Sequence, residues 1–291
     1  MLLEETASCY PVIRIGEAEI LQQKKYGELE YLCFPQLAKT GIADHLFTTR
    51  MGGVSTGIFS SLNLSYTRGD EAGAVDENFR RVAAIFDETP DRIVCSHQTH
   101  TTNVRLVTEE DAGKGVTRER EFTDVDGLIT DTPGLLLATF YADCVPLFFV
   151  DVRHKAIGLS HSGWRGTVER MGEKTLLAMK NAFGTRPEDV YAAIGPSICA
   201  DCYEIGFDVA EPFLKEFPEQ KGIVLPGKKE GKYQLDLWKA NETVLLDAGI
   251  LKEHLEITDI CTCHNSDYLF SHRASHGKRG NLAAFMELRK S

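Results

Sequence analysis

Histidine, cysteine and aspartate side chains in this sequence stand directly after short apolar runs. Asp143 and Cys144 lie between two such runs, His161 follows a third, and His97 and His100 follow a fourth. Thiolate and imidazole groups suit a soft divalent metal. An ionisable pair such as Asp143 and Cys144 is also a candidate for catalysis where the backbone around it is rigid. The sequence therefore indicates metal or acid–base chemistry at the ends of buried segments.

The apolar runs themselves are predicted to be buried strands. They cover residues 92–95, 135–140, 145–150 and 156–160, and each is too short to be a membrane helix. Strand ends are where an α/β fold exposes side chains to a ligand. Spacing alone does not decide between a metal site and scattered structural residues, because a lone histidine is more often a hydrogen-bonded structural group.

Helices are predicted among these strands, so the expected class is α/β. Apolar residues at helical spacing cover 77–86, and a second helix is expected over 168–183. Residues 190–194 are predicted to form a strand and residues 241–248 a helix that ends before a glycine. The polar segment 109–124 is expected to be a mobile loop. We find no repeat or charged linker, which favours one domain.

Charge and composition limit the classes of partner. The formal net charge of -11 argues against binding to a nucleic-acid polymer, because neutralising phosphates needs a basic surface. Small anions stay open as ligands through local arginines. Residues 1–5 lack the basic and apolar regions of a secretory signal, and Asp143 and Pro146 interrupt the longest apolar stretch. We expect a cytoplasmic protein without a membrane partner.

The eight cysteines include one further pattern with the look of a metal site. Cys199 and Cys202 form one half, and Cys261, Cys263 and His264 form the other. A structural zinc site is conceivable here, but Cys-x-Cys is an unusual half-site and the halves lie far apart in the sequence. Core or loop cysteines are the favoured interpretation, and a disulfide framework is not expected without a secretory signal.

The turn Gly163-Trp164-Arg165-Gly166 precedes the helix predicted over 168–183. Free backbone N–H groups at a helix start, with a nearby arginine, attract anions such as phosphate or a carboxylate. The alternative is a tight turn in which Trp164 fills the core and Arg165 is solvated. Taken alone, the turn favours that alternative. Its position beside His161 keeps anion binding open.

Several motifs together resemble one known family. They are Phe47-Thr48-Thr49-Arg50-Met51-Gly52-Gly53-Val54-Ser55, Gln98-Thr99-His100, Ala142-Asp143-Cys144, His161-Ser162-Gly163-Trp164-Arg165-Gly166, Ile194-Gly195-Pro196 and Ser271-His272-Arg273. In this order they are typical of the multicopper polyphenol oxidase, or purine nucleoside phosphorylase, family of bacterial YlmD and YfiH proteins and mammalian laccase-domain proteins. The chain departs from the usual motifs at Tyr141, where threonine is common, and at Thr101, where glycine is frequent.

The resemblance implies a fold and a metal. The fold is a single-domain layered α/β/β/α sandwich of the YfiH-like, cysteine-hydrolase-like type. Residues 1–291 would form this one domain, with 1–45 as a less certain N-terminal extension. The family's metal ligands map onto His100, Cys144 and His161. Two imidazoles and a thiolate suit zinc with an open fourth position, while copper belongs to the older oxidase description.

The resemblance also implies an activity on purine nucleosides and phosphate. The family's reactions are phosphorolysis of adenosine, inosine, guanosine and methylthioadenosine, and deamination of adenosine. Asp143, Cys144 and His161 are the expected catalytic residues, with Asp143 as a proton carrier in deamination. The expected substrate and phosphate ligands are Arg50, Gln98, Gly163, Arg165 and Arg273.

Three alternatives stay open at this point. One is a copper-dependent polyphenol oxidase. Another is a cysteine-type hydrolase or deamidase in which Cys144 is the nucleophile and His161 its base. The third is a zinc protein without catalytic activity. One predicted metal site without a further clear cluster is a poor basis for multi-electron oxygen reduction, which favours the nucleoside enzyme.

Overall fold

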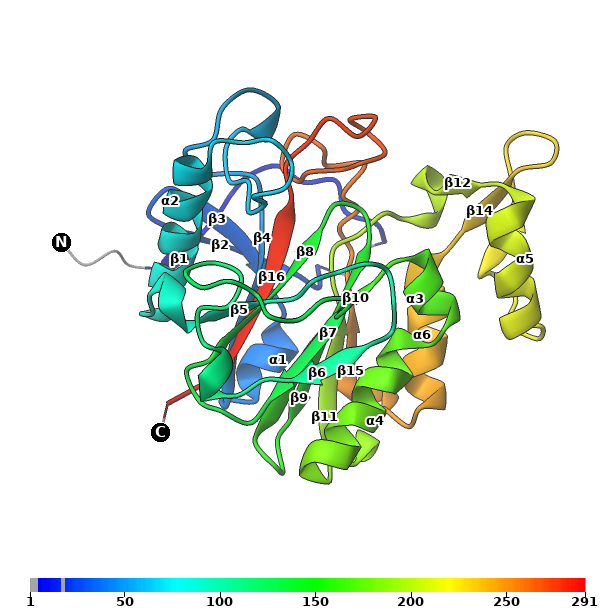
Figure 1. Cartoon of the computed structure of the whole chain (residues 1–291). Coiled ribbons are helices and arrows are strands. Elements are labelled where there is room, and N and C mark those ends of the chain that lie inside the picture. The colour runs from blue at the N-terminus through cyan, green and yellow to red at the C-terminus, as the bar shows by residue number, and fades with distance from the viewer. Residues whose placement is uncertain (1–4, 17–18, 291) are drawn as a thin grey trace.

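Two large β-sheets lie face to face, and helices cover the outer face of each (Figure 1). The computed structural model describes residues 5–16 and 19–290. Residues 1–4, for which the sequence predicts no secretory signal, lie outside the described residues. The layers run helix, sheet, sheet, helix. This arrangement confirms the predicted α/β/β/α sandwich. The assignment of residues 1–45 as an extension stays a prediction.

The first sheet has seven strands in the order β1-β2-β3-β4-β16-β8-β5, all antiparallel except for the pair β8 and β5. In chain order its strands are β1 (Glu5–Ala7), β2 (Gln22–Tyr26), β3 (Leu29–Cys33), β4 (Ala43–Thr48), β5 (Ile93–Cys95), β8 (Leu136–Tyr141) and β16 (Leu282–Leu288).

The second sheet has six strands in the order β15-β11-β9-β10-β7-β6. In chain order these are β6 (Val104–Leu106), β7 (Gly127–Thr130), β9 (Val145–Asp151), β10 (Ala156–Ser162), β11 (Val190–Ile194) and β15 (Leu255–Ile257). Every residue of β9 and β10 is buried, because both faces of this sheet are covered. Such strands have continuous apolar sequences without alternation, as predicted.

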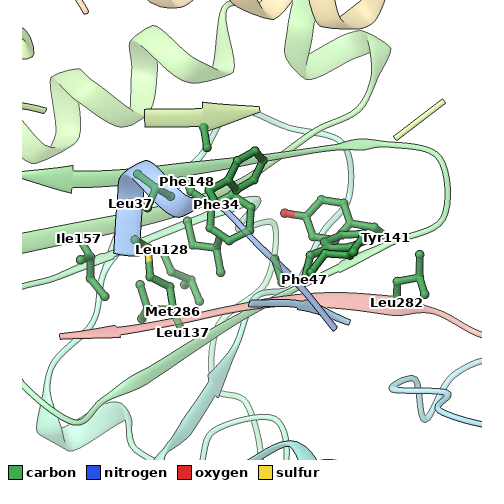
Figure 2. Packing of buried hydrophobic residues seen from close by; sticks show 14 of the residues in the cluster. Phe34, Leu37, Phe47, Leu128, Leu137, Tyr141, Phe148, Ile157, Leu282 and Met286 are labelled. Carbon is green, nitrogen blue, oxygen red and sulfur yellow. The ribbon is translucent and has the colours of Figure 1, made fainter. Parts of the chain in front are cut away.

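The core between the two sheets is built from large apolar side chains (Figure 2). Phe47 and Met286 come from the seven-stranded sheet, and Phe148 and Ile157 come from the six-stranded one. Burying a side chain of this size contributes about 1.5–3 kcal/mol. The sheets are thus held at a fixed separation, which fixes the strand ends that carry the site.

Helices cover the outer faces through amphipathic sequences. On the seven-stranded sheet, α2 (Ala72–Ala83) buries Val75, Phe79 and Val82. On the six-stranded sheet lie α4 (Met171–Phe183) and α6 (Leu237–Asp247), and the Asp236 side chain caps α6 by accepting a hydrogen bond from the Lys239 amide. The short helix α1 (Pro35–Lys39) contacts β4 and β11.

A small unit extends from one end of the second sheet (Figure 1). It contains α5 (Phe207–Glu216) and a three-stranded sheet of β12 (Glu204–Ile205), β14 (Tyr233–Leu235) and β13 (Val224–Pro226). Apolar residues such as Phe213 and Leu235 join it to the core of the second sheet.

One helix predicted from the sequence was wrong in detail. The helix expected over 168–183 is broken into α3 (Trp164–Val168) and α4, because Arg170 takes a left-handed conformation with φ of 63°. Its guanidinium forms ion pairs with Glu173 and also with Glu216 and Asp247, which lie far away in the sequence and leave no local signal.

The polar segment 109–124 is largely a loop, as predicted. It begins with a 3₁₀ turn over Glu109–Asp111, and the buried Asp111 carboxylate accepts a hydrogen bond from the buried Lys114 ammonium at 3.0 Å. The polar sequence of this segment predicts exposed side chains, so it does not reveal that these two charged groups are buried. Residues 115–120 of the segment include side chains that line a cavity described below.

Glu287 near the end of β16 gives the fold a specific pH dependence. Burial, together with the negative charges of Glu88 and Asp44, raises the pKa of its carboxyl group to about 8. Its Oε2 atom has no hydrogen-bond partner among the described residues. The pKa of this group is higher in the folded state than in the unfolded state. The folded protein therefore loses stability as the pH rises from 4.5, the ordinary pKa of the group, towards about 8.

We predict that Glu287→Gln raises the melting temperature by roughly 2–6 °C at alkaline pH, because the amide removes the buried charge. Well below pH 4.5, the ordinary pKa of a glutamate carboxyl, the wild-type group is protonated in both states, and the two proteins should melt together. Scanning calorimetry over this pH range tests it, with the exposed Glu110→Gln as a control. An equal gain at both pH values, or none at alkaline pH, would contradict the assignment.

Candidate metal centre

The three motifs that the sequence singles out meet in space. His100 lies in the loop after β5, Cys144 in the link that crosses from β8 to β9, and His161 in β10. One ligand atom from each lies within 4.8 Å of the others, and the Sγ atom of Cys144 is 3.9 Å from Nε2 of His100. Bond lengths to zinc of about 2.0–2.3 Å require ligand atoms about 3.5 Å apart. The cluster therefore has the size of a metal site.

Asp126 orients this cluster, and sequence reasoning missed it. Its Oδ1 atom lies 2.7 Å from Nδ1 of His161, so Nδ1 carries the proton and Nε2 faces the other ligands. The same carboxylate accepts hydrogen bonds from the amides of Thr99, His100 and Thr101 at 2.9, 3.2 and 3.1 Å. The available signal was an aspartate directly before the short apolar segment of β7.

Thr101 and Tyr141, the two departures from the family motifs, leave these contacts intact. The amide of Thr101 supplies its hydrogen bond to Asp126 through the backbone, which any residue offers. Tyr141 is buried, and its hydroxyl donates to the carbonyl of Ser160 at 3.0 Å. Its ring lies 5.5 Å from the ring of His161, so it forms part of the wall beside a ligand.

Cys144 and His161 strongly shift each other's pKa. Burial opposes ionisation of the thiol, but the charge of His161 and the hydrogen bonds from His100 and His161 lower the pKa of Cys144 to about 6. Burial likewise opposes protonation of His161, while Cys144 and Asp126 raise its pKa to about 9. At neutral pH the pair is thus a Cys144 thiolate, the form that binds metal, beside a His161 imidazolium, which must lose the proton on Nε2 before it can bind metal.

A cavity of about 650 Å³ opens beside the three ligands. All three line it, together with aromatic side chains that include Tyr66, Phe79, Phe140 and Tyr141. Four arginines also line it, namely Arg68, Arg118, Arg120 and Arg279. In the part of the chain that the structure describes, none of the four forms an ion pair with a carboxylate, although Glu119 is in the same wall. A polar anion would find positive charge there.

Arg279 is partly buried, and its surroundings disfavour its charged form. Burial, together with the positive charge of Arg68, lowers the pKa of Arg279 to about 10. Its Nε atom is buried without a hydrogen-bond partner among the described residues, and Nη1 donates to Asn281 and to the carbonyl of Gly280. An anion in the cavity would relieve the repulsion between Arg68 and Arg279.

Other residues expected to bind substrate have structural contacts. Gln98 lines the cavity, but its amide group donates to the carbonyl of Phe140 and accepts from the Phe140 amide, both at 2.7 Å. Arg50 donates to the carbonyls of Ser60 and Ser266 and lies over the ring of Phe270. It is outside the cavity lining.

Arg165 and Arg273 also lie outside the cavity lining. Arg165 lies over the ring of its neighbour Trp164. Arg273 donates to the carbonyls of Cys202 and Glu204 at 2.9 and 3.1 Å. The helix that follows Gly163 has five residues, too few to offer a strong helix dipole.

Hydrogen bonds hold the carboxylate of Asp143 in place. One carboxylate oxygen accepts from the Thr262 hydroxyl and the other from the amide of Arg273, both at 2.7 Å. Its φ is 88°, which turns the chain sharply between the two sheets. These contacts fix the residue directly before Cys144. A role of Asp143 as proton carrier stays a prediction.

The chain matches, over residues 44–289, the family described as multi-copper polyphenol oxidoreductase laccase. It belongs to this family. The resemblance of the sequence motifs is thereby confirmed. Purine nucleoside phosphorylase YlmD from Bacillus subtilis is 34% identical over 249 residues, which is 84% of this chain and 88% of that protein. Adenosine deaminase RL5 from an unknown prokaryotic organism is 32% identical, over 84% of this chain and 94% of its own length.

The solved structures agree with the family assignment. The crystal structure of YlmD from Geobacillus stearothermophilus superposes with a TM-score of 0.82 at 34% identity, covering 96% of this chain and all of that one. Since the relatives of this laccase-family chain are enzymes, the chain is an enzyme. Within the described residues, no helix has the length and apolar character needed to cross a membrane.

Gly163 lies against two ligands and offers a test of the cluster. A Cβ atom at this position would be 2.8 Å from Cδ2 of His100 and 3.3 Å from Sγ of Cys144. We predict that Gly163→Ala lowers zinc affinity about 10–100-fold by displacing the His100 ring, the loss typical of altered support around a ligand. Zinc titration with a competing chelator measures it.

Gly166→Ala is the matched control for this prediction. Gly166 lies in the short helix that follows Gly163, and a Cβ atom there would meet its nearest neighbours at 3.6–3.7 Å, an ordinary contact distance. Zinc affinity should then stay close to that of the wild type. Equal affinities in the two variants would show that metal does not bind beside Gly163.

Proposed function

We propose that this laccase-family chain is a zinc-dependent enzyme of purine nucleosides. It phosphorolyses adenosine, inosine, guanosine and methylthioadenosine to the base and the ribose 1-phosphate or methylthioribose 1-phosphate, and it deaminates adenosine to inosine. The observation that carries the proposal is one cavity lined by a His-Cys-His cluster, by aromatic rings and by arginines without carboxylate partners among the described residues. The names of the relatives support it.

The donor set fits zinc. Two imidazole nitrogens and one thiolate sulfur are borderline-soft ligands, and the cavity leaves one side of the cluster open to a ligand. Copper binds similar donors, and the family description names it. An electron-transfer role would need further metal centres at this cavity, and its other described walls hold no second such cluster. Bound zinc would polarise the substrate group or water placed in the open position.

The cavity walls have distinct roles in phosphorolysis. Aromatic side chains such as Phe140 and Tyr66 supply apolar area for the planar purine. Arginines hold inorganic phosphate so that one of its oxygens faces the anomeric carbon of the ribose. The new bond joins that oxygen to the carbon, the bond from carbon to the purine nitrogen breaks, and the base takes up a proton as it leaves.

Product analysis tests the proposed reactions. Purified zinc-loaded protein should convert inosine to hypoxanthine and ribose 1-phosphate only when phosphate is present, and adenosine to inosine without phosphate. His161→Ala should lose both reactions, since it removes a ligand. Copper-dependent oxidation of phenols without conversion of any purine nucleoside would overturn the proposal.

The cavity arginines give a sharper prediction. Arg279→Gln should raise the KM for phosphate about tenfold or more, because charge-assisted contacts to phosphate contribute about 1.5–3 kcal/mol each. Zinc content and phosphate-independent deamination should change little by comparison. Arg50→Gln tests the competing site predicted from the sequence. A larger rise in KM for Arg50→Gln than for Arg279→Gln would place the phosphate site outside the cavity.

A cysteine hydrolase is the second candidate, because Cys144 and His161 form a nucleophile and base pair held by Asp126. Alkylation separates it from the zinc enzyme. Iodoacetamide should label Cys144 rapidly in metal-free protein at neutral pH, and stoichiometric zinc should suppress the labelling. Rapid labelling with zinc present, together with amide hydrolysis, would favour the hydrolase.

A further inference from the structure

A second group of metal-ligating side chains lies outside the cavity. Cys199, Cys202, Cys261 and His264 each place one ligand atom within 4.8 Å of the other three. The Sγ atom of Cys199 is 3.9 Å from Nδ1 of His264. None of the four lines the cavity, and none of the three cysteines is in a disulfide. We propose that these four residues bind a second zinc ion with a structural role.

Local structure presents both halves of this site. Cys199 directly precedes a 3₁₀ turn over Ala200–Cys202 and Cys202 ends it, and in such a turn side chains three residues apart eclipse one another. Cys261 and His264 have the same spacing in a turn closed by the Asn265 amide, which donates to the carbonyl of Cys261 at 3.2 Å. Each half therefore directs two ligand atoms to one side.

The two halves are held together by the backbone. The Thr262 amide donates to the carbonyl of Ser197 at 3.1 Å, and Ser197 and Cys261 form an isolated parallel bridge. The Sγ atom of Cys261 accepts a hydrogen bond from the Cys199 amide at 3.3 Å. Amide donors to sulfur stabilise a thiolate ligand and fix its direction. Cys199 and Cys261, which are 62 residues apart in the sequence, thus lie side by side in the fold.

Three sulfurs and one imidazole complete a tetrahedral zinc shell, and a complete shell marks a structural site with no position for substrate. Zinc–sulfur bonds of about 2.3 Å require sulfur atoms about 3.8 Å apart, so the present separations need only a small contraction. Cys199 and Cys261 are buried, with 5% and 0% of their surface exposed, while Cys202 is partly buried and His264 is exposed.

The position of the site explains what it would stabilise. Residues that flank the four ligands hold Asp143, the neighbour of Cys144. The Ile198 amide donates to the carbonyl of Asp143 at 3.0 Å, and the Thr262 hydroxyl donates to its carboxylate. Zinc at the second site would lock the loops after β11 and β15 in this arrangement. The two sites are thereby mechanically linked but bind metal separately.

Zinc counting tests the proposal on the full chain. Wild-type protein should hold two zinc ions by mass spectrometry, and Cys202→Ser and His161→Ala should each hold one. Cys9→Ser, at an exposed cysteine outside both groups, should keep both ions. Undiminished zinc in Cys202→Ser overturns the second site. Undiminished zinc in His161→Ala overturns the first site alone, so the two failures are distinguishable.

X-ray absorption on the wild-type protein needs no variant. One sulfur at the first site and three at the second predict about two sulfurs per zinc on average, against one if only the first site is filled. An average near one, or a disulfide among Cys199, Cys202 and Cys261 in the freshly purified protein, would overturn the proposal.

The fourth ligand has its own test, because Cys263 lies next to His264 in the sequence and close to Cys202 in the structure. His264→Ala should weaken retention of the second zinc against a chelator at least tenfold. Cys263→Ser should leave that retention unchanged. The reverse ranking would replace the proposed Cys₃His shell by four cysteines and overturn the assignment of His264.

Discussion

The buried carboxylate of Asp126 is the contact on which the candidate metal centre depends. It joins the loop after β5 to strand β10, because it accepts hydrogen bonds from three backbone amides of the loop and from the imidazole of His161. Burial opposes its ionisation, but the hydrogen bond and charge of His161 and the amides of Thr99 and Thr101 outweigh burial and lower the pKa of Asp126. A buried carboxylate without such partners would cost several kcal/mol. Because one group satisfies both segments, His100 and His161 cannot move independently of each other.

Cys144 completes the cluster through a different constraint. The link between β8 and β9 crosses from one sheet to the other, and the turn at Asp143 is held by residues from two loops that follow β11 and β15. The core between the sheets fixes the distance that this link must span (Figure 2). Ligands from three strand ends thus meet without any one of them being placed by its own local sequence. Aromatic and cationic side chains line the cavity beside them, which is the lining that the proposed nucleoside and phosphate substrates require.

Much of the fold could be predicted from the sequence, because buried strands such as β9 and β11 leave continuous apolar runs. The break at Arg170 could not, since a left-handed arginine held by distant carboxylates has no local pattern. The same reason explains the site. His100, Cys144 and His161 stand out by residue type and motif, whereas Asp126, Arg279 and the joining of Cys199 to Cys261 depend on contacts between segments far apart in the chain.

The most direct measurement of the central claim is the zinc affinity of Asp126→Asn against that of Asp151→Asn. Asp151 holds His154 in the same way, with Nδ1 to Oδ2 at 2.8 Å and two amide donors, but away from the metal ligands. Asparagine keeps the shape of either site while removing the charge that orients the imidazole. The account predicts a loss of about 10–100-fold in zinc affinity for Asp126→Asn and none for Asp151→Asn. Equal affinities in the two variants would contradict it.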